Sequence, residues 1–530
     1  MNYAVNSIEM KKIDTYTVEV VKLPALVLME RAALEVSEVI KKLVHKSDRI
    51  LAICGPGNNG GDGIAAGRIL FLQGYQVAIL FLGDESKATN QTKAQLEIMR
   101  NLGITFENNN KLHEYNIIID AIFGVGLSRP VTGEYEAIIN EINELNWTNL
   151  DDRNASDRLV FSVDIPSGIS ADSGKIMNTA VRANYTITFG LQKQGLLVYP
   201  GVDYAGVTTV ADIGFPQIAM KQANLNTFYY GAEDLNRLPA RKNYSHKGTY
   251  GKVLVIAGSK GMSGAAYLCA KAAYRSGAGI VKLLTSNDNR EILQTSLPEA
   301  LFTAYDHEGI NTVEREKQLI EEISWASVIV IGPGLGQSDR AGELLNLVIK
   351  EAKVPVIIDA DGLNLLANML NLGYHDASSR WNYLSQILRP DTILTPHLME
   401  LSRLLGIPIS EISNNMIDTA SPYSYNNKLI VAIKDARTVV TQSRCRYINV
   451  SGNNGMATGG SGDVLTGIIA ALIAQGMASF DATCLAVYIH GLSGDIAASK
   501  KGAYSMMAGD IIDSIEIIMN RDNLKSIDNM

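Results

Sequence analysis

The chain has 530 residues, which is too long for one ordinary hydrophobic core, so we expect two or more domains. Hydrophobic residues make up 46% of it and charged residues 19%, a balance typical of soluble globular proteins. The net charge is −8, from 47 basic and 55 acidic residues, and no basic tract is interleaved with aromatic residues, so we expect no nucleic-acid partner.

We also expect no secretory signal, no membrane partner and no disulfide framework. Residues 1–20 carry acidic side chains among the apolar ones and lack an uninterrupted apolar core. The most apolar run, VLTGIIAALIAQGMASF at 464–480, is short and contains polar residues, which favours a buried helix over a membrane span. The cysteines are widely spaced without a CxxC pair, which indicates no zinc site and suits a reducing cytoplasm; they are Cys54, Cys269, Cys445 and Cys484.

The first half of the chain reads as an α/β domain. RILAICG (49–55) predicts a strand, GPGNNGGDG (55–63) a loop, IAAGRILFLQG (64–74) a helix and YQVAILFL (75–82) a second strand. Further apolar runs separated by helical patterns indicate a mostly parallel sheet covered on both faces; they are IIIDAIFG (117–124), LVFSVDIPSG (159–168), YTITFG (185–190) and VTTVADIGFP (207–216). Pro216 and the polar stretch KQANLNT (221–227) predict a linker after them.

The loop GPGNNGGDG is a candidate ligand site. It lies between a predicted strand and a predicted helix, where backbone N–H groups favour anions and ligand oxygens. It is neither a Walker A motif nor a GxGxxG motif. A glycine turn that serves only strand–helix packing is the alternative, but Asn58, Asn59 and Asp62 among the glycines favour a binding role.

Two aspartates stand at the ends of later strands in this half. Asp120 ends IIID and Asp164 ends FSVD. In open parallel sheets, ligands gather beyond the carboxyl ends of the strands. Each aspartate could instead be a cap or turn residue, but together with the asparagine loop they predict one polar site without a Ser-His-Asp arrangement.

Four segments of the first half resemble the NAD(P)HX epimerase family, the YjeF N-terminal domain: LMERAA (28–33), GPGNNGGDG, DAIFGVGLSRPVTG (120–133) and VDIPSG (163–168). The resemblance spans most of residues 1–218 and implies a Rossmann-like three-layer α/β/α domain. It implies that a potassium ion is held by Asn59, Asp120 and Ser167 with nearby carbonyls. It further implies contacts to the hydrated nicotinamide nucleotide from Asn58, Asn59, Gly60, Gly61, Asp62, Gly124, Val125, Gly126, Leu127, Ser128, Arg129, Pro130 and Asp164.

The implied epimerase site is chemically reasonable. A large monovalent cation needs several oxygen ligands, as other hard cations do, and amide, carboxylate, hydroxyl and peptide oxygens supply them. The substrate carries its hydroxyl on a carbon next to the ring nitrogen, whose lone pair helps that hydroxyl leave and return. Inverting the carbon then requires mainly proton transfer, and we expect Asp164 to act as general acid and base.

The second half, residues 225–530, predicts a larger α/β domain. Its apolar runs are separated by helical segments; they are GKVLVIAGS (251–259), IVKLLT (280–285), SVIVIGPGLG (327–336), VPVIIDADGL (354–363), DTILTPH (391–397) and LIVAIKDARTVVT (429–441). Polar residues again follow the strands. Asp359 or Asp361 could cap a helix. His397 and Glu400 have a spacing that metal sites use, but no further ligand cluster appears, so a substrate contact is favoured over metal ligation.

The segment GMATGGSGDVLTG (455–467) is the strongest feature of the second half. Its small residues allow backbone N–H groups to approach phosphate oxygens, and the following helix adds a positive dipole end. Asp463 is then placed to accept a hydroxyl proton, as catalytic aspartates do in phosphoryl transfer. An ordinary aspartate at a helix start is the alternative. Alone, this half predicts a small-molecule kinase.

A larger set of segments resembles the ADP-dependent NAD(P)HX dehydratase family over residues 225–520: HKGTYG, GSKGMSGAA, GAGIVKL, PEA, GPGLG, DADGL, LTPHLMEL, GNNGMATGGSGDVLTG and HGLSGDIAA. The resemblance implies a ribokinase-like fold. It implies contacts to the hydrate from Ala265, Gly336, His397 and Asp463, and to the adenine nucleotide from Lys434, Asp435, Ala436, Arg437, Thr438 and Gly462. The family usually has Lys-Gly where this chain has Lys434-Asp435, so the nucleotide loop is the weakest part of the match.

Together the two resemblances imply one bifunctional enzyme that repairs hydrated NADH and NADPH. The first domain interconverts the R and S epimers of NAD(P)HX with K⁺, and the second dehydrates the (6S) epimer with ADP and Mg²⁺, giving AMP and phosphate. NADHX, NADPHX and ADP are then the expected small-molecule partners, and we expect a homo-oligomer. Two alternatives stay open: a true kinase for a hydroxymethyl-pyrimidine or thiazole alcohol, and a first domain that only binds a nucleotide or partner.

Overall fold

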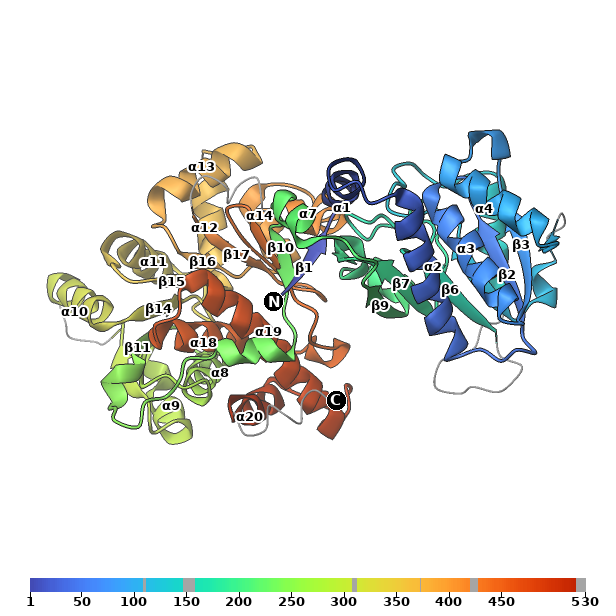
Figure 1. The fold of residues 1–530 in the computed structure, drawn as a ribbon. Coiled ribbons are helices and arrows are strands. Elements are labelled where there is room, and N and C mark those ends of the chain that lie inside the picture. The colour runs from blue at the N-terminus through green and yellow to red at the C-terminus, as the bar shows by residue number, and fades with distance from the viewer. Residues whose placement is uncertain (108–110, 146–157, 307–311, 372, 420–427, 521–530) are drawn as a thin grey trace. The chain divides into compact units, whose positions relative to one another are not determined.

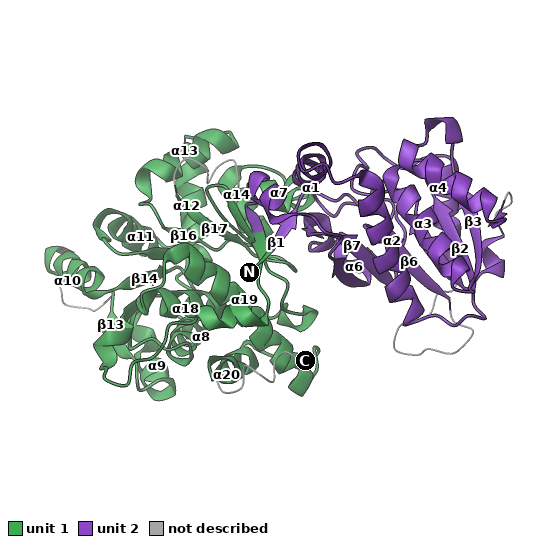
Figure 2. Ribbon diagram, in the orientation of Figure 1, with its two compact units in different colours: residues 1–2, 228–530 green, residues 3–227 purple. Residues whose placement is uncertain are grey.

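The computed structural model describes residues 1–107, 111–145, 158–306, 312–371, 373–419 and 428–520 (Figure 1). They divide into two compact units (Figure 2). We call residues 3–227 the N-terminal unit. Residues 228–530 together with residues 1–2 are the C-terminal unit. The assignment of residues 1–218 and 225–530 to two functional domains stays a prediction.

The N-terminal unit is built around parallel strands. Its strands are β1 (Asn2–Val5), β2 (Arg49–Cys54), β3 (Gln76–Phe81), β4 (Thr105–Phe106), β5 (Ile117–Ala121), β6 (Leu159–Val163), β7 (Tyr185–Phe189), β8 (Gln192–Lys193) and β9 (Val207–Ala211). Its helices are α1 (Ser7–Thr15), α2 (Ala25–Lys41), α3 (Asn58–Leu72), α4 (Asn90–Asn101), α5 (Glu134–Glu144), α6 (Gly201–Ala205) and α7 (Gln217–Gln222), with a π-helical turn at Tyr16–Val20.

Helices cover both faces of the sheet in this unit. The strand order is β4-β3-β2-β5-β6-β7-β9, and every neighbouring pair is parallel. Alternate residues of one strand enter different cores because side chains alternate across a sheet. Ile50 and Ala52 pack with α2 and α3, whereas Leu51 and Ile53 pack with α5. The predicted Rossmann-like three-layer domain is confirmed.

One local prediction for this unit was wrong. The loop predicted over residues 55–63 is shorter, because α3 begins at Asn58 and includes the sequence NNGGDG. Tertiary packing therefore overrides the low helix propensity of glycine and asparagine in this segment. The polar stretch 221–227, predicted as a linker, ends where the two compact units divide, and the short helix α7 precedes and overlaps it.

The C-terminal unit is larger. Its strands are β10 (Thr227–Tyr229), β11 (Lys252–Ile256), β12 (Ile280–Thr285), β13 (Leu301–Ala304), β14 (Val328–Ile331), β15 (Val356–Ile358), β16 (Ile393–Leu394), β17 (Ile430–Ile433), β18 (Val439–Gln442) and β19 (Cys445–Ile448). Its helices are α8 (Ser263–Arg275), α9 (Arg290–Ser296), α10 (Thr312–Trp325), α11 (Asp339–Glu351), α12 (Asp361–Asn371), α13 (Ala377–Ile387), α14 (Leu398–Leu405), α15 (Ile409–Asn414), α16 (Met416–Thr419), α18 (Ser461–Ala474), α19 (Ser479–Lys501) and α20 (Ala508–Met519).

The sheet of this unit is parallel in its larger part and antiparallel at one side. The strand order is β13-β12-β11-β14-β15-β16-β17-β18-β19-β10. The strands from β13 to β17 pair in parallel, and β17-β18-β19 pair antiparallel. The run at 429–441 is therefore two strands joined by a turn, not the single strand predicted. The predicted α/β fold of the second domain is confirmed, with helices on both sides of the sheet (Figure 1).

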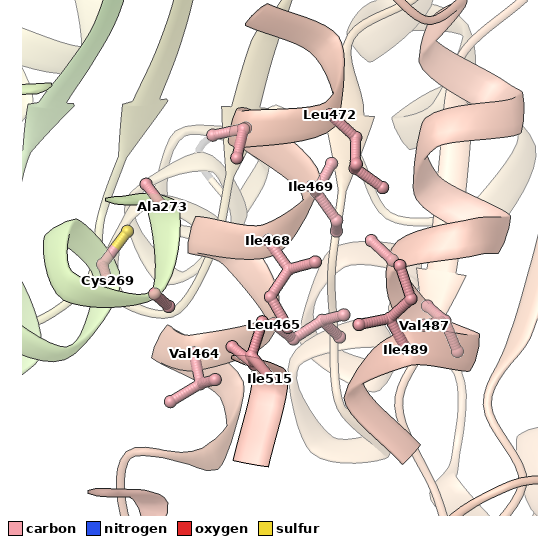
Figure 3. Close-up of a cluster of buried hydrophobic side chains, with 14 of the residues drawn as sticks. Cys269, Ala273, Val464, Leu465, Ile468, Ile469, Leu472, Val487, Ile489 and Ile515 are labelled. Atoms are coloured by element: carbon pink, nitrogen blue, oxygen red, sulfur yellow. The ribbon is translucent and has the colours of Figure 1, made fainter. Parts of the chain in front are cut away.

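A continuous apolar core joins four helices to one face of this sheet. Cys269 of α8, Ile468 of α18, Ile489 of α19 and Ile515 of α20 meet in it (Figure 3). The apolar run at 464–480 is buried as predicted, although α18 ends at Ala474 and α19 begins at Ser479. Among the described residues, no helix is long and apolar enough to cross a membrane.

Candidate active sites in the two units

The carboxylate of Asp120 organises the first polar centre of the N-terminal unit. It is completely buried at the end of β5 and accepts hydrogen bonds from Ser162 Oγ at 2.7 Å, Ser167 N at 2.9 Å and Ser167 Oγ at 2.5 Å. Burial raises the pKa of Asp120, and these hydrogen bonds lower it again in part. Within the described parts of the chain, Asp120 forms no ion pair, so its charge is stabilised by neutral donors only.

The three residues proposed as potassium ligands meet at the backbone of Phe123. Asn59 Nδ2 donates to the carbonyl of Phe123 at 3.0 Å, and Ser167 Oγ accepts from Phe123 N at 2.9 Å while bonding to Asp120. A Cβ at Gly124 would lie 3.1–3.2 Å from the side chain of Asn59. Amide, hydroxyl, carboxylate and carbonyl oxygens are therefore gathered in one small volume.

The glycine-rich segment has a packing role as well as polar side chains. A Cβ at Gly60 would lie 1.8 Å from the carbonyl oxygen of Gly55, so only glycine allows α3 to start this close to the end of β2. By contrast, a Cβ at Gly57 would meet nothing within 4 Å. Gly60 thus serves strand–helix packing, which was the alternative to a binding role for this segment. Asn59 instead bonds to the loop after β5 through the carbonyl of Phe123.

Asp164 forms the second polar centre, and its backbone is held in the left-handed region with φ +65°. Its Oδ1 accepts from Lys193 Nζ at 2.5 Å, Thr188 Oγ1 at 3.1 Å and Phe189 N at 3.1 Å. Lys193 is only 1% exposed and also donates to the carbonyl of Phe189 at 2.9 Å. Asp164 is therefore the carboxylate half of a buried ion pair.

Asp62, the fifth residue of α3, interacts with this ion pair. Its pKa is raised well above the usual value, first by burial and then by the negative charges of Asp164 and Asp14, while Lys193 opposes the rise. The side chain is half-buried and has no hydrogen-bond partner among the described residues. Burial and like charges thus favour the protonated form of Asp62.

The remaining predicted contacts of the first half lie in the loop after β5. Gly126, Ser128, Arg129 and Pro130 are exposed, while Gly124, Val125 and Leu127 are half-buried. The loop begins beside Asn59, so its first residues lie at the polar centre. No contact of its outer residues with Asp164 is present in the described structure.

In the C-terminal unit the buried carboxylate is Asp359, which is 1% exposed and follows β15. Its Oδ1 accepts from Lys434 Nζ at 2.7 Å, and its Oδ2 accepts from Thr466 Oγ1 at 2.8 Å. Thr466 Oγ1 also lies 2.9 Å from the carbonyl of Gly462, and a Cβ at Gly462 would lie 3.3 Å from Lys434 Nζ. Lys434 and Gly462, both predicted nucleotide contacts, are therefore neighbours.

Asp463 lies in the first turn of α18, beside this ion pair. Its pKa is raised to about 7, first by burial and then by the charges of Asp359 and Asp361, while Lys434 lowers it. Glu400 also has its pKa raised to about 7, mainly by burial, with Lys434 lowering it. These two carboxyl groups titrate near neutral pH, where general acid–base catalysts work best.

Gly336 and Ala265 are brought to the same region by the loop after β14. Gly336 N donates to Asp361 Oδ2 at 2.8 Å, and a Cβ at Gly334 would lie 2.9 Å from the Cβ of Ala265. Asp361 is the first residue of α12, and its carboxylate accepts this hydrogen bond from the loop. Of the predicted substrate contacts, Gly336 is thus bonded to Asp361, Asp463 is affected by its charge, and Ala265 lies beside Gly334 of the same loop.

His397 has a clear structural role as the N-cap of α14. Its Nδ1 accepts from Met399 N at 3.1 Å and Glu400 N at 3.2 Å, and its own N–H donates to Glu400 Oε2 at 2.8 Å. Burial and the nearby Lys434 lower its pKa. No group of three or more metal-ligating side chains occurs in the described residues. A substrate contact stays a prediction.

The other predicted nucleotide contacts lie in the turn between β17 and β18. Asp435 and Ala436 are exposed, and Arg437 and Thr438 are half-buried. Thr438 O accepts a hydrogen bond from Asn449 N at 2.9 Å, so the turn is anchored to the residue after β19. Of these five consecutive residues, only Lys434 contacts Asp359.

Sequence reasoning missed Lys193, Thr188 and Thr466, and it weighed Asp359 only as a cap. Lys193 sits in the polar segment QKQG, where a lysine is expected to face solvent. Thr188 and Thr466 lie within apolar runs, where a hydroxyl gives no signal of its partner. Only the position of Asp359 after a predicted strand, at the edge where ligands gather, could have indicated its importance.

Comparisons with known proteins agree with the division into two units. A family model described as YjeF-related protein N-terminus matches residues 25–195, and one described as NAD(P)H-hydrate dehydratase matches residues 253–517. The bifunctional NAD(P)H-hydrate repair enzyme Nnr of Thermofilum pendens is 35% identical over 93% of this chain and 92% of its own length. That of Moorella thermoacetica is 34% identical over 98% and 96%.

Solved structures of single-domain length are also similar to this chain. One is the ADP/ATP-dependent NAD(P)H-hydrate dehydratase of Bacillus subtilis, co-crystallised with ATP and Mg²⁺. It is 28% identical and covers 55% of this chain and 98% of its own, with a TM-score of 0.46.

Proposed function

The chain belongs to the family of bifunctional NAD(P)H-hydrate repair enzymes, and from this membership we propose that each of its units carries one of two successive reactions. The N-terminal unit interconverts the R and S epimers of NAD(P)HX. The C-terminal unit dehydrates the (6S) epimer to NAD(P)H with ADP, giving AMP and phosphate. The observation that carries this proposal is that relatives named bifunctional NAD(P)H-hydrate repair enzyme match more than nine-tenths of the chain at above 30% identity.

In the epimerase unit we assign the proton transfer to Asp164. Oδ1 of this carboxylate is held by three donors, so its other oxygen can face the substrate. The hydroxyl of the hydrate leaves with help from the ring nitrogen's lone pair and returns to the opposite face, which requires a group that gives and takes a proton. The predicted contacts from Asn58 to Asp62, and from Gly124 to Pro130, bind the nucleotide around this centre.

The oxygen donors around Phe123 suit a potassium ion. Asn59, Asp120 and Ser167 supply three different oxygen types, and the buried Asp120 carboxylate has no ammonium or guanidinium partner in the described chain. A bound K⁺ would neutralise that charge and tie α3 to the loop after β5. The donor set therefore fits the ion that the family resemblance implies.

In the dehydratase unit we assign the base to Asp463. Its carboxyl group accepts the proton of the substrate hydroxyl as that oxygen attacks the terminal phosphorus of ADP, and AMP leaves. The ring nitrogen then expels phosphate, which regenerates the dihydronicotinamide. The N–H groups at the start of α18, including Gly462, stabilise charge on the transferring group.

The remaining dehydratase residues bind the two ligands. Ala265, Gly336 and His397 contact the hydrate, and Gly462 with residues 434–438 contacts the nucleotide. Because the Lys434 ammonium is already paired with Asp359, its contribution to nucleotide affinity is smaller than that of an unpaired lysine. Mg²⁺ on the phosphates is part of the proposal, and no protein ligands are assigned to it.

The test is to incubate the purified protein with both NADHX epimers, ADP, Mg²⁺ and K⁺, and to follow the absorbance of NADH. Full recovery of both epimers, with AMP and phosphate as co-products, is expected. Recovery that stops after one epimer would make the N-terminal unit a binding module. A stable phosphorylated product without NADH would instead favour a small-molecule kinase. Omitting K⁺ should slow conversion of the R epimer only.

The proposed partners are small molecules, namely NADHX, NADPHX and ADP. A homo-oligomer and a cytoplasmic location also stay predictions. Light scattering of the purified chain under assay conditions measures its oligomeric state.

A further inference from the structure

We propose that Lys193 is a positioning residue of the epimerase site: its buried ammonium holds Asp164 as an oriented, ionised base, and Asp62 then supplies the proton. This inference rests on the proposed epimerase function and divides between two residues the acid and base roles that were given above to Asp164 alone. Neither Lys193 nor a proton-donating role for Asp62 follows from the motifs in the sequence.

The first step is the geometry of the ion pair. Lys193 ends β8, and Asp164 directly follows β6, 29 residues earlier. Lys193 Nζ lies 2.5 Å from Asp164 Oδ1 and 2.9 Å from the carbonyl oxygen of Phe189. Two oxygens thus fix the ammonium at a position that is 1% exposed. A buried ammonium is costly unless it is paired, so this lysine is held where it constrains Asp164.

The second step is the asymmetry of the Asp164 carboxylate. Oδ1 accepts from Lys193, Thr188 Oγ1 and Phe189 N, whereas Oδ2 accepts no hydrogen bond from the described residues. The side chain retains 12% exposure. One oxygen is therefore used for orientation, and the other is left for a ligand. The backbone of Asp164 is also in the strained left-handed region, with φ +65°. Such strain persists only where the surrounding structure holds the residue, so this backbone angle also indicates that Asp164 is held in a fixed orientation.

The third step is the charge balance of the cluster. The charges of Asp164, Asp14 and Lys193 all act on Asp62. Lys193 pairs directly with Asp164, while Asp62 forms no ion pair or hydrogen bond with described residues. Burial and the like charges therefore favour the protonated form of Asp62.

These charges define a balanced reaction. Asp62 gives its proton to the hydroxyl of the hydrate, and water leaves as the ring nitrogen's lone pair forms a carbon–nitrogen double bond. Water then adds to the opposite face of that carbon, and Asp164 takes the released proton while the electron pair returns to nitrogen. One proton passing through solvent from Asp164 to Asp62 restores the starting state. No oxidant or reductant takes part.

The experiment compares two variants of the lysine with a matched control in the full-length chain. Lys193→Met removes the charge, and Lys193→Gln keeps a hydrogen-bond donor without it. Arg68→Met is the control, because the side chain of Arg68 is 14% exposed and forms an ion pair with Glu30 in the same unit. Starting from the R epimer of NADHX, we expect both Lys193 variants to slow epimerisation on the order of 100-fold, the scale of general acid–base catalysis. The control should retain the wild-type rate.

The pH profile distinguishes positioning from a purely structural role. In the wild type, the rate should fall at high pH as Asp62 loses its proton. Lys193 lowers the pKa of Asp62, so removing the ammonium should move this high-pH limb to higher pH in both Lys193 variants. An unchanged profile with a uniformly lower rate would mean that Lys193 only supports the fold, and the proposal would be wrong.

A double-variant cycle keeps the result interpretable if Lys193→Met is unstable. If Lys193 acts through Asp164, adding Lys193→Met to Asp164→Asn should change the residual rate little, whereas independent roles would multiply the two losses.

Dehydration of the S epimer by the same chain reports the integrity of the C-terminal unit. If the wild type itself fails to epimerise, the proposed function fails. If the wild type epimerises and the Lys193 variants match it, only this inference fails.

Discussion

The two units each place a lysine beside a proposed catalytic carboxyl group, but they pair the lysine differently. In the N-terminal unit, Lys193 pairs with Asp164, the group proposed to react. In the C-terminal unit, Lys434 pairs with Asp359, and the proposed base Asp463 is left among like charges with its pKa raised to about 7.

This difference matches the chemistry proposed for each unit. An ammonium on the reacting carboxylate keeps it ionised and fixes its orientation, which suits a proton exchange with water. An ammonium on the neighbouring carboxylate leaves the reacting group more basic, which suits removal of a proton from a hydroxyl. The same residue types thus prepare an oriented base in one unit and a stronger base in the other.

The largest effect that tests the comparison is expected from Asp463→Asn. Losing the base should slow dehydration of the S epimer on the order of 1,000-fold, while conversion of the R epimer to the S epimer continues. NADH absorbance measures dehydration, and chromatographic separation of the epimers measures epimerisation. Retained dehydration would remove Asp463 from the role of base.

The next effect concerns the pairing of Lys434. Lys434→Met leaves the buried Asp359 without its ion-pair partner, which should destabilise the C-terminal unit by about 3 kcal/mol. Denaturant unfolding, followed with a probe in that unit, measures the loss. Lys350→Met is the control, because its ion pair with Glu351 is exposed and should contribute about 1 kcal/mol or less. Equal stability of the two variants would contradict the pairing.

A glycine pair tests whether packing alone can disable one unit. Gly60→Ala places a methyl group 1.8 Å from the carbonyl of Gly55 and should cost about 2 kcal/mol, whereas Gly57→Ala meets nothing and should cost little. Epimerisation should fall with Gly60→Ala, and dehydration in the other unit should persist. Thermal unfolding and the two activity assays check this, and equal behaviour of both variants would exclude close packing as the cause.

The smallest effect is in the pH dependence of stability. Glu400 has its pKa raised to about 7, so between about pH 4.5 and 7 the folded unit binds more protons than the unfolded chain. Stability contributed by this group is therefore present below that window and is lost as pH rises through it. Glu400→Gln should flatten the decline by on the order of 1 kcal/mol. Unfolding measured at pH 5 and pH 7 tests the sign; a steeper decline in the variant would reverse it.

The fold was largely predictable from the sequence, because strands buried on both faces appear as continuous apolar runs. The runs that became β2, β5, β6, β11 and β14 were all identified. Errors arose where local signals conflicted with packing. The NNGGDG segment looks like a loop, yet α3 begins within it because Gly60 packs on Gly55. The run at 429–441 looked like one strand, although the polar residues 434–438 form a turn between two.

The candidate sites divide in the same way between sequence and tertiary structure. Sequence motifs predicted which strand ends and glycine-rich turns carry polar residues, because ligands gather at the carboxyl edge of parallel strands and motif residues are adjacent in the chain. Which charges meet could not be predicted. Asp164 and Lys193 are 29 residues apart, and Asp359 and Lys434 are 75 apart. Only the packing of their strands brings each ammonium to its carboxylate, and the same packing buries the neighbouring Asp62 and Asp463, which raises the pKa of both.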